Sequence, residues 1–174
     1  MFLLVKNKMF AKKKCLYYII LNMKVNIVCV GKIKEKFFTD AIGEYEKRLS
    51  RFCTLNIIEV PEATKFTNLE QKSNIEGELL LAKAAGVIVA LDGRGKELSS
   101  PEIAKFIEEK KVSGSSVISF VIGGSNGLSK AVLDKADLRL SFGKITFPHQ
   151  LFRVVLAEQI YRAFTIIDGL PYHK

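Results

Sequence analysis

The sequence predicts an α/β fold, in which a mostly parallel β-sheet carries helices on both faces. Short apolar segments alternate with longer segments of helical periodicity along almost the whole chain. Some of the short segments are apolar at nearly every position, which is typical of strands that are covered on both faces. With 174 residues, of which 48% are hydrophobic, the chain is long enough for one domain with a substantial core.

Five strands are expected after Met23, most of them ended by glycine, proline or polar residues. They are predicted at Val25–Val30, Leu55–Val60, Val87–Leu91, Val117–Ile122 and Leu138–Phe142. Gly31 follows the first strand and Pro61 the second, where a proline without an N–H cannot continue a sheet.

The segments between the strands are expected to be helical. In Glu35–Phe52, apolar residues recur at spacings of three and four, as in a helix with one buried face: Phe38, Ile42, Tyr45 and Leu49. The other helices are predicted within residues 65–85, becoming regular by Ile75, and at residues 100–111, 129–135 and 148–167. Ser100 is expected to cap the third helix, and Pro101 and Pro148 are expected at first helical positions, which suit the fixed φ of proline.

Residues 1–22 differ from the rest of the chain. They hold five lysines and no acid, so they carry +5 of the net charge of +9, and the other 152 residues carry +4. Their apolar part is at the short end for a secretory signal, lacks a small-residue cleavage site before Lys24, and is too short to span a bilayer. Because Met23 opens a strand, we expect residues 1–22 to be an extension outside a single domain of residues 23–174. A membrane-surface anchor is the alternative for this segment.

The composition limits the possible functions. A charge of +4 on the main body is compatible with a nucleic-acid partner but does not require one. The three cysteines have no CxxC spacing and the chain has only two histidines, so no metal site is expected. Cys29 lies in an apolar strand and is predicted to be a buried thiol, which suits the reducing cytoplasm.

Three loops follow predicted strands, at Asp92–Lys96, Gly123–Gly127 and Gly143–Pro148. In an open parallel sheet these loops lie at one edge, where a single ligand can contact all three. The dinucleotide pattern GxGxxG fails in the second loop, where Ser125 takes the third position, and no loop has the P-loop pattern. Either the glycines let a ligand approach the bare backbone, or they only form tight turns.

Several polar residues near these loops have two interpretations. Asp92 is either a base or ribose contact, or it accepts hydrogen bonds from its own turn. His149 either meets a ligand or hydrogen-bonds the helix start, and Arg153 lies on the same face at i+4. Glu158 and Arg162 have the spacing of a helix-surface ion pair. The tail, Asp168–Lys174, combines an aromatic ring, an imidazole and an ammonium, although chain ends are usually frayed.

Seven motifs in the same order resemble those of one family, the ribosomal RNA large-subunit methyltransferases H of the SPOUT class. The motifs lie at Val28–Lys32, Glu44–Leu49, Leu91–Lys96, Val121–Leu128, Leu140–Arg153, Glu158–Ala163 and Pro171–Lys174. The resemblance extends from Met23 to Lys174. Seven motifs in order are far more specific than any single glycine loop.

The resemblance implies an α/β fold with a C-terminal trefoil knot. It also implies that the protein uses S-adenosylmethionine to methylate N3 of a pseudouridine in large-subunit ribosomal RNA. The family is cytoplasmic and homodimeric and acts on the ribosome. Backbone contacts to S-adenosylmethionine are implied at Leu91, Gly123, Phe142, Gly143, Lys144, Ile145, Thr146 and Phe147. For catalysis we expect His173 as the base, Tyr172 to stack on or hydrogen-bond the target base, and Arg153 to steady the anion or a phosphate.

Two other functions remain as alternatives. The first is a nucleotide-binding oxidoreductase of the same α/β class, against which the broken GxGxxG pattern and the absent ribose-binding acid argue. The second is a non-catalytic RNA-binding module, which the charge of +4 neither favours nor excludes.

Overall fold

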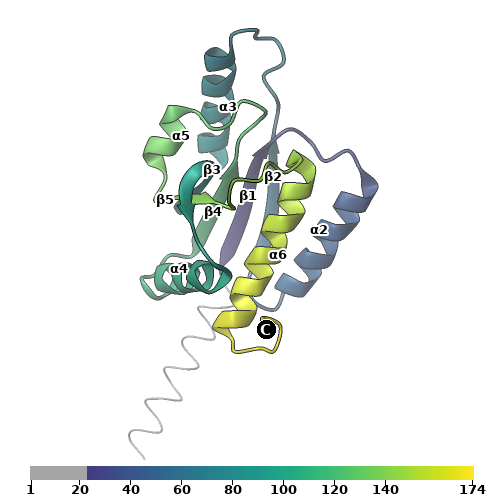
Figure 1. Cartoon of the computed structure of the whole chain (residues 1–174), viewed down its shortest axis with the longest axis vertical. Coiled ribbons are helices and arrows are strands. Elements are labelled where there is room, and N and C mark those ends of the chain that lie inside the picture. The colour runs from purple at the N-terminus through teal and green to yellow at the C-terminus, as the bar shows by residue number, and fades with distance from the viewer. Residues whose placement is uncertain (1–22) are drawn as a thin grey trace, which may run out of the picture.

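The computed structural model describes residues 23–174. The predicted extension of residues 1–22 and its alternative as a membrane-surface anchor lie outside these residues. Ten elements follow one another along the described chain, with strands and helices in alternation (Figure 1). They are β1 (Lys24–Val30), α2 (Lys36–Leu49), β2 (Thr54–Val60), α3 (Leu69–Lys83), β3 (Val87–Glu97), α4 (Ser100–Val112), β4 (Val117–Ile122), α5 (Lys130–Lys135), β5 (Leu138–Ser141) and α6 (His149–Ile167).

The five strands form one sheet in the order β2-β1-β4-β3-β5, and every pair of neighbours is parallel. The α/β class predicted from the sequence is therefore confirmed. Because all strands point the same way, their carboxyl ends and the loops that follow them lie at one edge of the sheet. This edge carries the candidate site.

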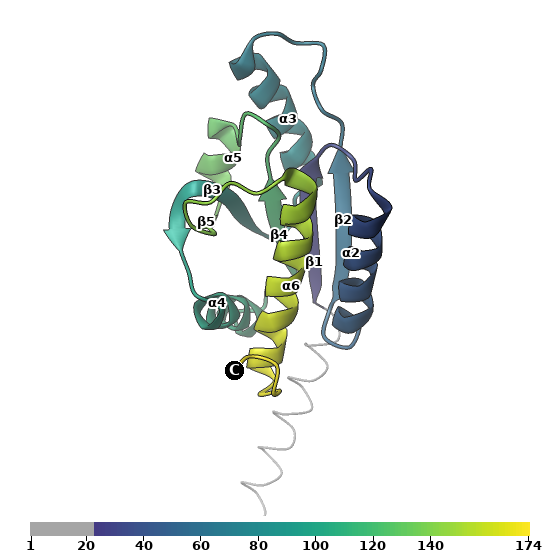
Figure 2. The same cartoon turned by 45° about the vertical axis from the view of Figure 1, so that its right-hand side comes forward.

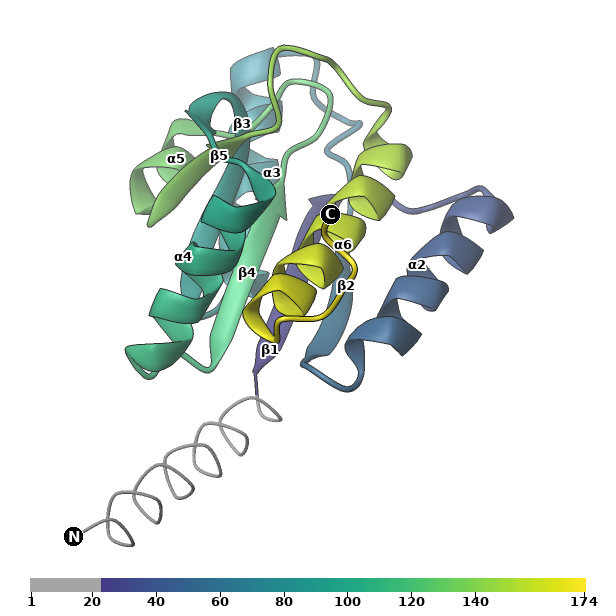
Figure 3. The same ribbon diagram turned by 60° about the horizontal axis from the view of Figure 1, so that its bottom comes forward.

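Helices cover both faces of the sheet. On one face α6 packs between α2 and α4, and on the other α3 packs against α5 (Figures 2 and 3). The larger core lies under α2, α4 and α6, and includes Phe120 from β4 and Ile160 and Phe164 from α6, each at most 1% exposed. The smaller core lies under α3 and α5 and includes Leu80 and Val132. Burial on both faces explains why the strands are almost continuously apolar.

Three predicted boundaries differ from the structure. The glycine-rich stretch Asp92–Lys96 belongs to β3, which shifts register against β5 between Leu91 and Lys96 and so accommodates the extra residues as a bulge. Ser99, rather than Ser100, caps α4, in a capping box with Glu102. Pro148 is the N-cap of α6, with an extended ψ of 134°, rather than its first helical residue.

Arg153 is the clearest correction to the sequence analysis. We expected its guanidinium to contact an anionic substrate, but the residue is only 2% exposed. Nη1 donates to Glu59 Oε1 at 2.9 Å, and Nη2 donates to the carbonyl oxygens of Val30 and Gly31 at 2.8 and 3.0 Å. Arg153 therefore joins the start of α6 to the carboxyl ends of β1 and β2.

We predict that Arg153→Met lowers the free energy of unfolding by about 3–5 kcal/mol, because it leaves the Glu59 carboxylate without its cation and removes the guanidinium donor of two carbonyl oxygens. Urea denaturation followed by circular dichroism measures this change. Arg139→Met, which removes a half-exposed arginine at the edge of the sheet, serves as the control with an expected change below about 1 kcal/mol. Unchanged stability with a lost affinity for RNA would restore the substrate-contacting role.

The two described cysteines are buried, as predicted for Cys29. Burial raises the pKa of the Cys29 thiol to about 11 and that of Cys53 to about 12, from an ordinary value of 9.0. Unfolded thiols lose their protons from about pH 9, whereas these do so only at higher pH. We therefore expect the stability that the two neutral thiols contribute to be present below pH 9 and to fall as the pH rises toward 11.

Mass spectrometry after iodoacetamide treatment at pH 8 tests the protonation of these thiols, because the thiolate is the reactive form. We expect neither Cys29 nor Cys53 to be alkylated in the folded protein and both to be alkylated in urea. Fast alkylation of either cysteine without denaturant would contradict the prediction.

Within residues 23–174, no helix combines the length and the apolar character that crossing a membrane requires. In the same part of the chain, no three histidine, cysteine, aspartate or glutamate side chains are grouped so that they could hold a metal ion.

Candidate functional site

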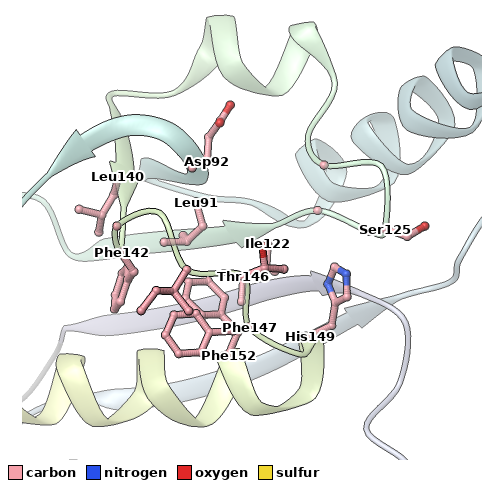
Figure 4. A pocket seen from close by; sticks show the side chains of 16 residues that line it. Leu91, Asp92, Ile122, Ser125, Leu140, Phe142, Thr146, Phe147, His149 and Phe152 are labelled. Atoms are coloured by element: carbon pink, nitrogen blue, oxygen red, sulfur yellow. The ribbon is translucent and has the colours of Figure 1, made fainter.

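A pocket of about 310 Å³ opens at the carboxyl ends of β4 and β5 and beside the irregular part of β3, where the sequence analysis expected three loops to converge (Figure 4). Each of the three loops contributes to its wall, and the first turn of α6 closes one side. The lining residues are Leu91, Asp92, Gly93, Ile122, Gly123, Gly124, Ser125, Gly127, Leu140, Phe142, Gly143, Ile145, Thr146, Phe147, His149 and Phe152.

The loop after β4 forms part of this wall with its backbone. A Cβ atom placed on Gly123 would lie 2.5 Å from the backbone of Gly127, which is closer than real Cβ atoms come to backbone. The turn is closed by a hydrogen bond from the Gly127 N–H to the Gly124 carbonyl oxygen at 3.0 Å. The glycines therefore serve both expected purposes, because they permit the tight turn and leave bare backbone at the pocket.

The pocket has an apolar end and a polar end. At the apolar end, the Phe152 ring meets Phe142 edge-on at 5.1 Å between centroids and stacks with Phe147 at 5.6 Å. At the other end lie Ser125 and His149 (Figure 4). A ligand with a flat apolar part and a charged or polar part matches this division.

Asp92 lines the pocket but is occupied by its own turn. Its Oδ1 accepts a hydrogen bond from the Arg94 N–H at 2.9 Å, and its Oδ2 lies 3.1 Å from Arg94 Nη2. The Arg94 guanidinium, more than any other group, holds the pKa of this carboxyl below its ordinary value. Of the two interpretations, the hydrogen-bonded turn is the one that the structure contains.

The structure brings seven of the eight predicted cofactor contacts into the wall of this pocket. The exception is Lys144, which is exposed and does not line it. Sequence analysis missed Leu140 and Phe152, because an apolar residue in a strand or helix has the same pattern whether it lines a pocket or the core. It considered His149 without assigning it a role, and the structure places it at the polar end.

The tail packs against the carboxyl-terminal half of α6 rather than against the pocket. Glu158 Oε1 accepts from Arg162 Nη2 at 2.5 Å and from the Tyr172 hydroxyl at 3.2 Å. His173 Nδ1 lies 3.5 Å from Arg162 Nη1. The Tyr172 ring meets Tyr161 edge-on at 4.9 Å and lies under the Arg162 guanidinium. We call Glu158, Arg162, Tyr172 and His173 the tail cluster.

Burial raises the pKa of Tyr172, and the neighbouring Glu158 raises it further, so its hydroxyl keeps its proton at neutral pH. The surface pair of Glu158 and Arg162 expected from the sequence is thus part of a larger, half-buried arrangement. It fixes a chain end that the sequence alone describes as frayed.

The pocket lies at the start of α6, and the tail cluster lies along its second half. His149 and Phe152, which line the pocket, are in the first turn of the helix, whereas the tail returns beside its second half (Figure 1). Glu158, which accepts a hydrogen bond from Tyr172, is about 9 Å further along the helix than Phe152. Within the described part of one chain, neither Tyr172 nor His173 lines the pocket.

Comparisons with known proteins identify the family. Ribosomal RNA large subunit methyltransferase H of Clostridium botulinum (strain 657 / Type Ba4) is 54% identical over 159 residues, with 87% of this chain and 100% of the relative covered. The protein of the same description from Carboxydothermus hydrogenoformans is 52% identical with the same coverage. The solved structure of a probable methylase family protein from Haemophilus influenzae has a TM-score of 0.49 to this chain at 12% sequence identity. The match covers 89% of this chain and 71% of that protein, and a similarity this low does not inform the site. A family model described as predicted SPOUT methyltransferase matches residues 23–173, and the chain belongs to this family.

Proposed function

We propose that this protein transfers a methyl group from S-adenosylmethionine to N3 of a pseudouridine in large-subunit ribosomal RNA. It acts on the ribosome in the cytoplasm, as a homodimer whose chains have a C-terminal trefoil knot. Membership in a methyltransferase family and the description of its 54% identical relative support the reaction class and the RNA. The observation that carries the proposal is the pocket built by three loops at the sheet edge.

The residues that form the wall of the pocket suit the chemical groups of S-adenosylmethionine. Its apolar end, with Leu140, Phe142 and Phe152, suits an adenine ring, which is flat and weakly polar. Gly123, Gly124 and Gly127 line the pocket without side chains, so their backbone is open to close contacts with the nucleoside. When bound, S-adenosylmethionine supplies an electrophilic methyl group on a positively charged sulfur.

The tail cluster supports a homodimer with a shared site. Tyr172 and His173 are the residues that the sequence analysis assigned to base and target contact together with Arg153, and Arg153 is buried. Because neither Tyr172 nor His173 lines the pocket of its own chain, we expect a second chain to bring its tail to that pocket. A twofold interface along α6 achieves this for both chains at once, since it places the end of each helix near the start of the other.

The chemistry requires little more than alignment and the removal of one proton. N3 of the pseudouridine loses its proton to His173 and forms a bond to the methyl carbon. The carbon–sulfur bond breaks as its electron pair passes to the sulfur. Arg162 lies beside His173 and over the Tyr172 ring, so we expect it to keep both side chains in position, with Tyr172 holding the target base. Much of the acceleration then comes from the position of the reacting atoms, which is why a small protein suffices.

Basic residues on α2 provide a surface for RNA next to the tail cluster. Arg48 lies 5.9 Å from the ring centroid of Tyr161, the residue against which Tyr172 packs. Lys47 on the same helix and Arg51 in the turn that follows it are exposed. Lys36 is paired with Asp40 at 2.6 Å, so it is less available to phosphates than the sequence suggested. Phosphate contacts at this surface would direct a ribosomal RNA toward the tail.

Methyl transfer to ribosomes tests the proposed reaction. Residues 23–174 and the full chain are incubated with labelled S-adenosylmethionine and with ribosomes from cells that lack the activity, and the RNA is digested and analysed by mass spectrometry. We expect methylation of a single pseudouridine at N3 in the large-subunit RNA. Calorimetry should show binding of S-adenosylmethionine and none of NAD.

The outcomes of this test separate the alternatives. Binding of NAD in place of S-adenosylmethionine would favour an oxidoreductase. Binding of neither, with retained affinity for RNA, would favour a non-catalytic module. Methylation at a base other than a pseudouridine would keep the reaction class and reject the substrate.

Mixed dimers test whether the site is shared. Thr146→Trp fills the pocket at an exposed position, and His173→Ala removes the base, so each homodimer should lose activity. For His173→Ala we expect turnover to fall by roughly 10²–10⁴-fold while the affinity for S-adenosylmethionine stays unchanged. A heterodimer of the two variants has one pocket and one tail intact on different chains. If the site is shared, it should regain about half the activity of the unmodified dimer.

Inactivity of the heterodimer would show that pocket and tail act within one chain. Thr67→Trp, the same change at an exposed threonine that does not line the pocket, is the matched control and should leave every dimer active.

A further inference from the structure

A buried acid lies directly behind the glycine turn of the pocket. Glu76, on α3, is 1% exposed. Its Oε1 accepts a hydrogen bond from the Ala63 N–H at 3.0 Å, whereas its Oε2 is fully buried and has no hydrogen-bond partner within residues 23–174. An unpaired buried oxygen costs free energy, because it has given up its hydrogen bonds to water. Packing alone does not account for a carboxylate at this position.

The free oxygen points at the wall of the pocket. A Cβ atom on Gly124 would lie 2.6 Å from Glu76 Oε2, so the oxygen is in contact with the bare Cα of that residue. Gly124 itself lines the pocket, at the polar end that Ser125 and His149 share. Only one layer of backbone therefore separates the carboxylate from the space that a ligand would occupy.

Glu76 shares its neighbouring cation with a second acid. Lys72, one turn earlier on α3, pairs with Glu62 at 2.7 Å. The hydrogen bond to Glu62 raises the pKa of Lys72 most, and the charge of Glu76 adds to it. His149 and Lys34 are close enough to Glu62 to lower the pKa of its carboxyl, although Lys72 lowers it more. Each of these cations thus acts on Glu62, whereas Glu76 has no ion pair within residues 23–174.

Asp92, the other acid at the pocket, does not supply such a field. It lines the pocket directly, but Arg94 compensates its charge at 3.1 Å. Glu76 is therefore the acid next to the pocket whose charge is least compensated within the described part of the chain. An uncompensated charge acts strongly over a short distance when the intervening medium is protein rather than water.

We propose that Glu76 is a specificity-determining residue, whose charge makes the pocket prefer a ligand with a positively charged sulfur over the same ligand with a neutral sulfur. This inference rests on the proposed function, in which the first ligand is S-adenosylmethionine and the second is its product, S-adenosylhomocysteine. The two differ by one methyl group and one positive charge. Glu76 thereby favours the exchange of spent product for fresh methyl donor after each turnover.

Calorimetry with both compounds, on the full-length dimer, tests this inference. The measured quantity is the ratio of the dissociation constants of S-adenosylhomocysteine and S-adenosylmethionine. Glu76→Gln keeps the shape of the side chain and removes its charge, so we expect the ratio to fall by roughly tenfold. The control is Glu78→Gln, the same change at an exposed position of α3, which should leave the ratio unchanged.

Lys72→Gln provides a test in the opposite direction. It removes the cation that Glu62 and Glu76 share, so the ratio should rise in favour of S-adenosylmethionine. It also decides the question if Glu76→Gln does not fold, which thermal unfolding followed by circular dichroism would reveal. Opposite shifts in the two variants would be hard to explain by a loss of structure, which weakens both ligands together.

Equal weakening of both ligands by Glu76→Gln would overturn the inference and leave Glu76 as a support of the turn, with the proposed function intact. An unchanged ratio in both variants would also overturn it. If the unmodified dimer bound neither compound, the proposed function would fail and this inference with it.

Discussion

The position of the pocket depends on the buried guanidinium of Arg153. It pairs with Glu59 and donates to carbonyl oxygens at the end of β1, and so attaches the first turn of α6 to the edge of the sheet where the strands end. Removal of a charge from water is costly, and only partners in a fixed geometry offset that cost. The start of α6 is therefore held in one place, beside the bulge of β3 and the loops that follow β4 and β5.

Once its start is fixed, α6 determines where both halves of the site lie. His149 and Phe152 come to the pocket, and the rest of the helix carries the chain away from it along the groove between α2 and α4. The tail then folds back onto Glu158 and Arg162 instead of hanging free. Within the described part of one chain, Tyr172 and His173 therefore lie outside the pocket. Under the proposed function, a dimer brings the tail of one chain to the pocket of the other.

The pocket is mainly a surface of backbone and apolar side chains, in which Asp92 is paired with Arg94 and Glu76 lies behind the wall. The turn at Gly123 and Gly124 exposes peptide groups and brings the carboxylate of Glu76 within one layer of the ligand space. Such an arrangement can recognise a nucleoside by the shape of the wall and a positively charged ligand group by the electric field of Glu76. No side chain then has to occupy the space of the ligand. It also explains why a few glycines in a short chain suffice for a specific site.

The sequence by itself determined the α/β class, the five strands, most helix boundaries and the three loops at one sheet edge. These follow from local periodicity, from glycine and proline, and from the rule that parallel strands end together. Tertiary structure alone decided the strand order, the continuation of β3 through Asp92–Lys96, the burial of Arg153 and the packing of the tail. Each of these depends on groups far apart in the chain, as when Arg153 pairs with Glu59 across 94 residues. The contact between Glu76 on α3 and Gly124 in the loop after β4 is of the same kind. Local patterns contain no information about such partners, because an arginine on a helix has the same spacing whether it faces water or a buried carboxylate.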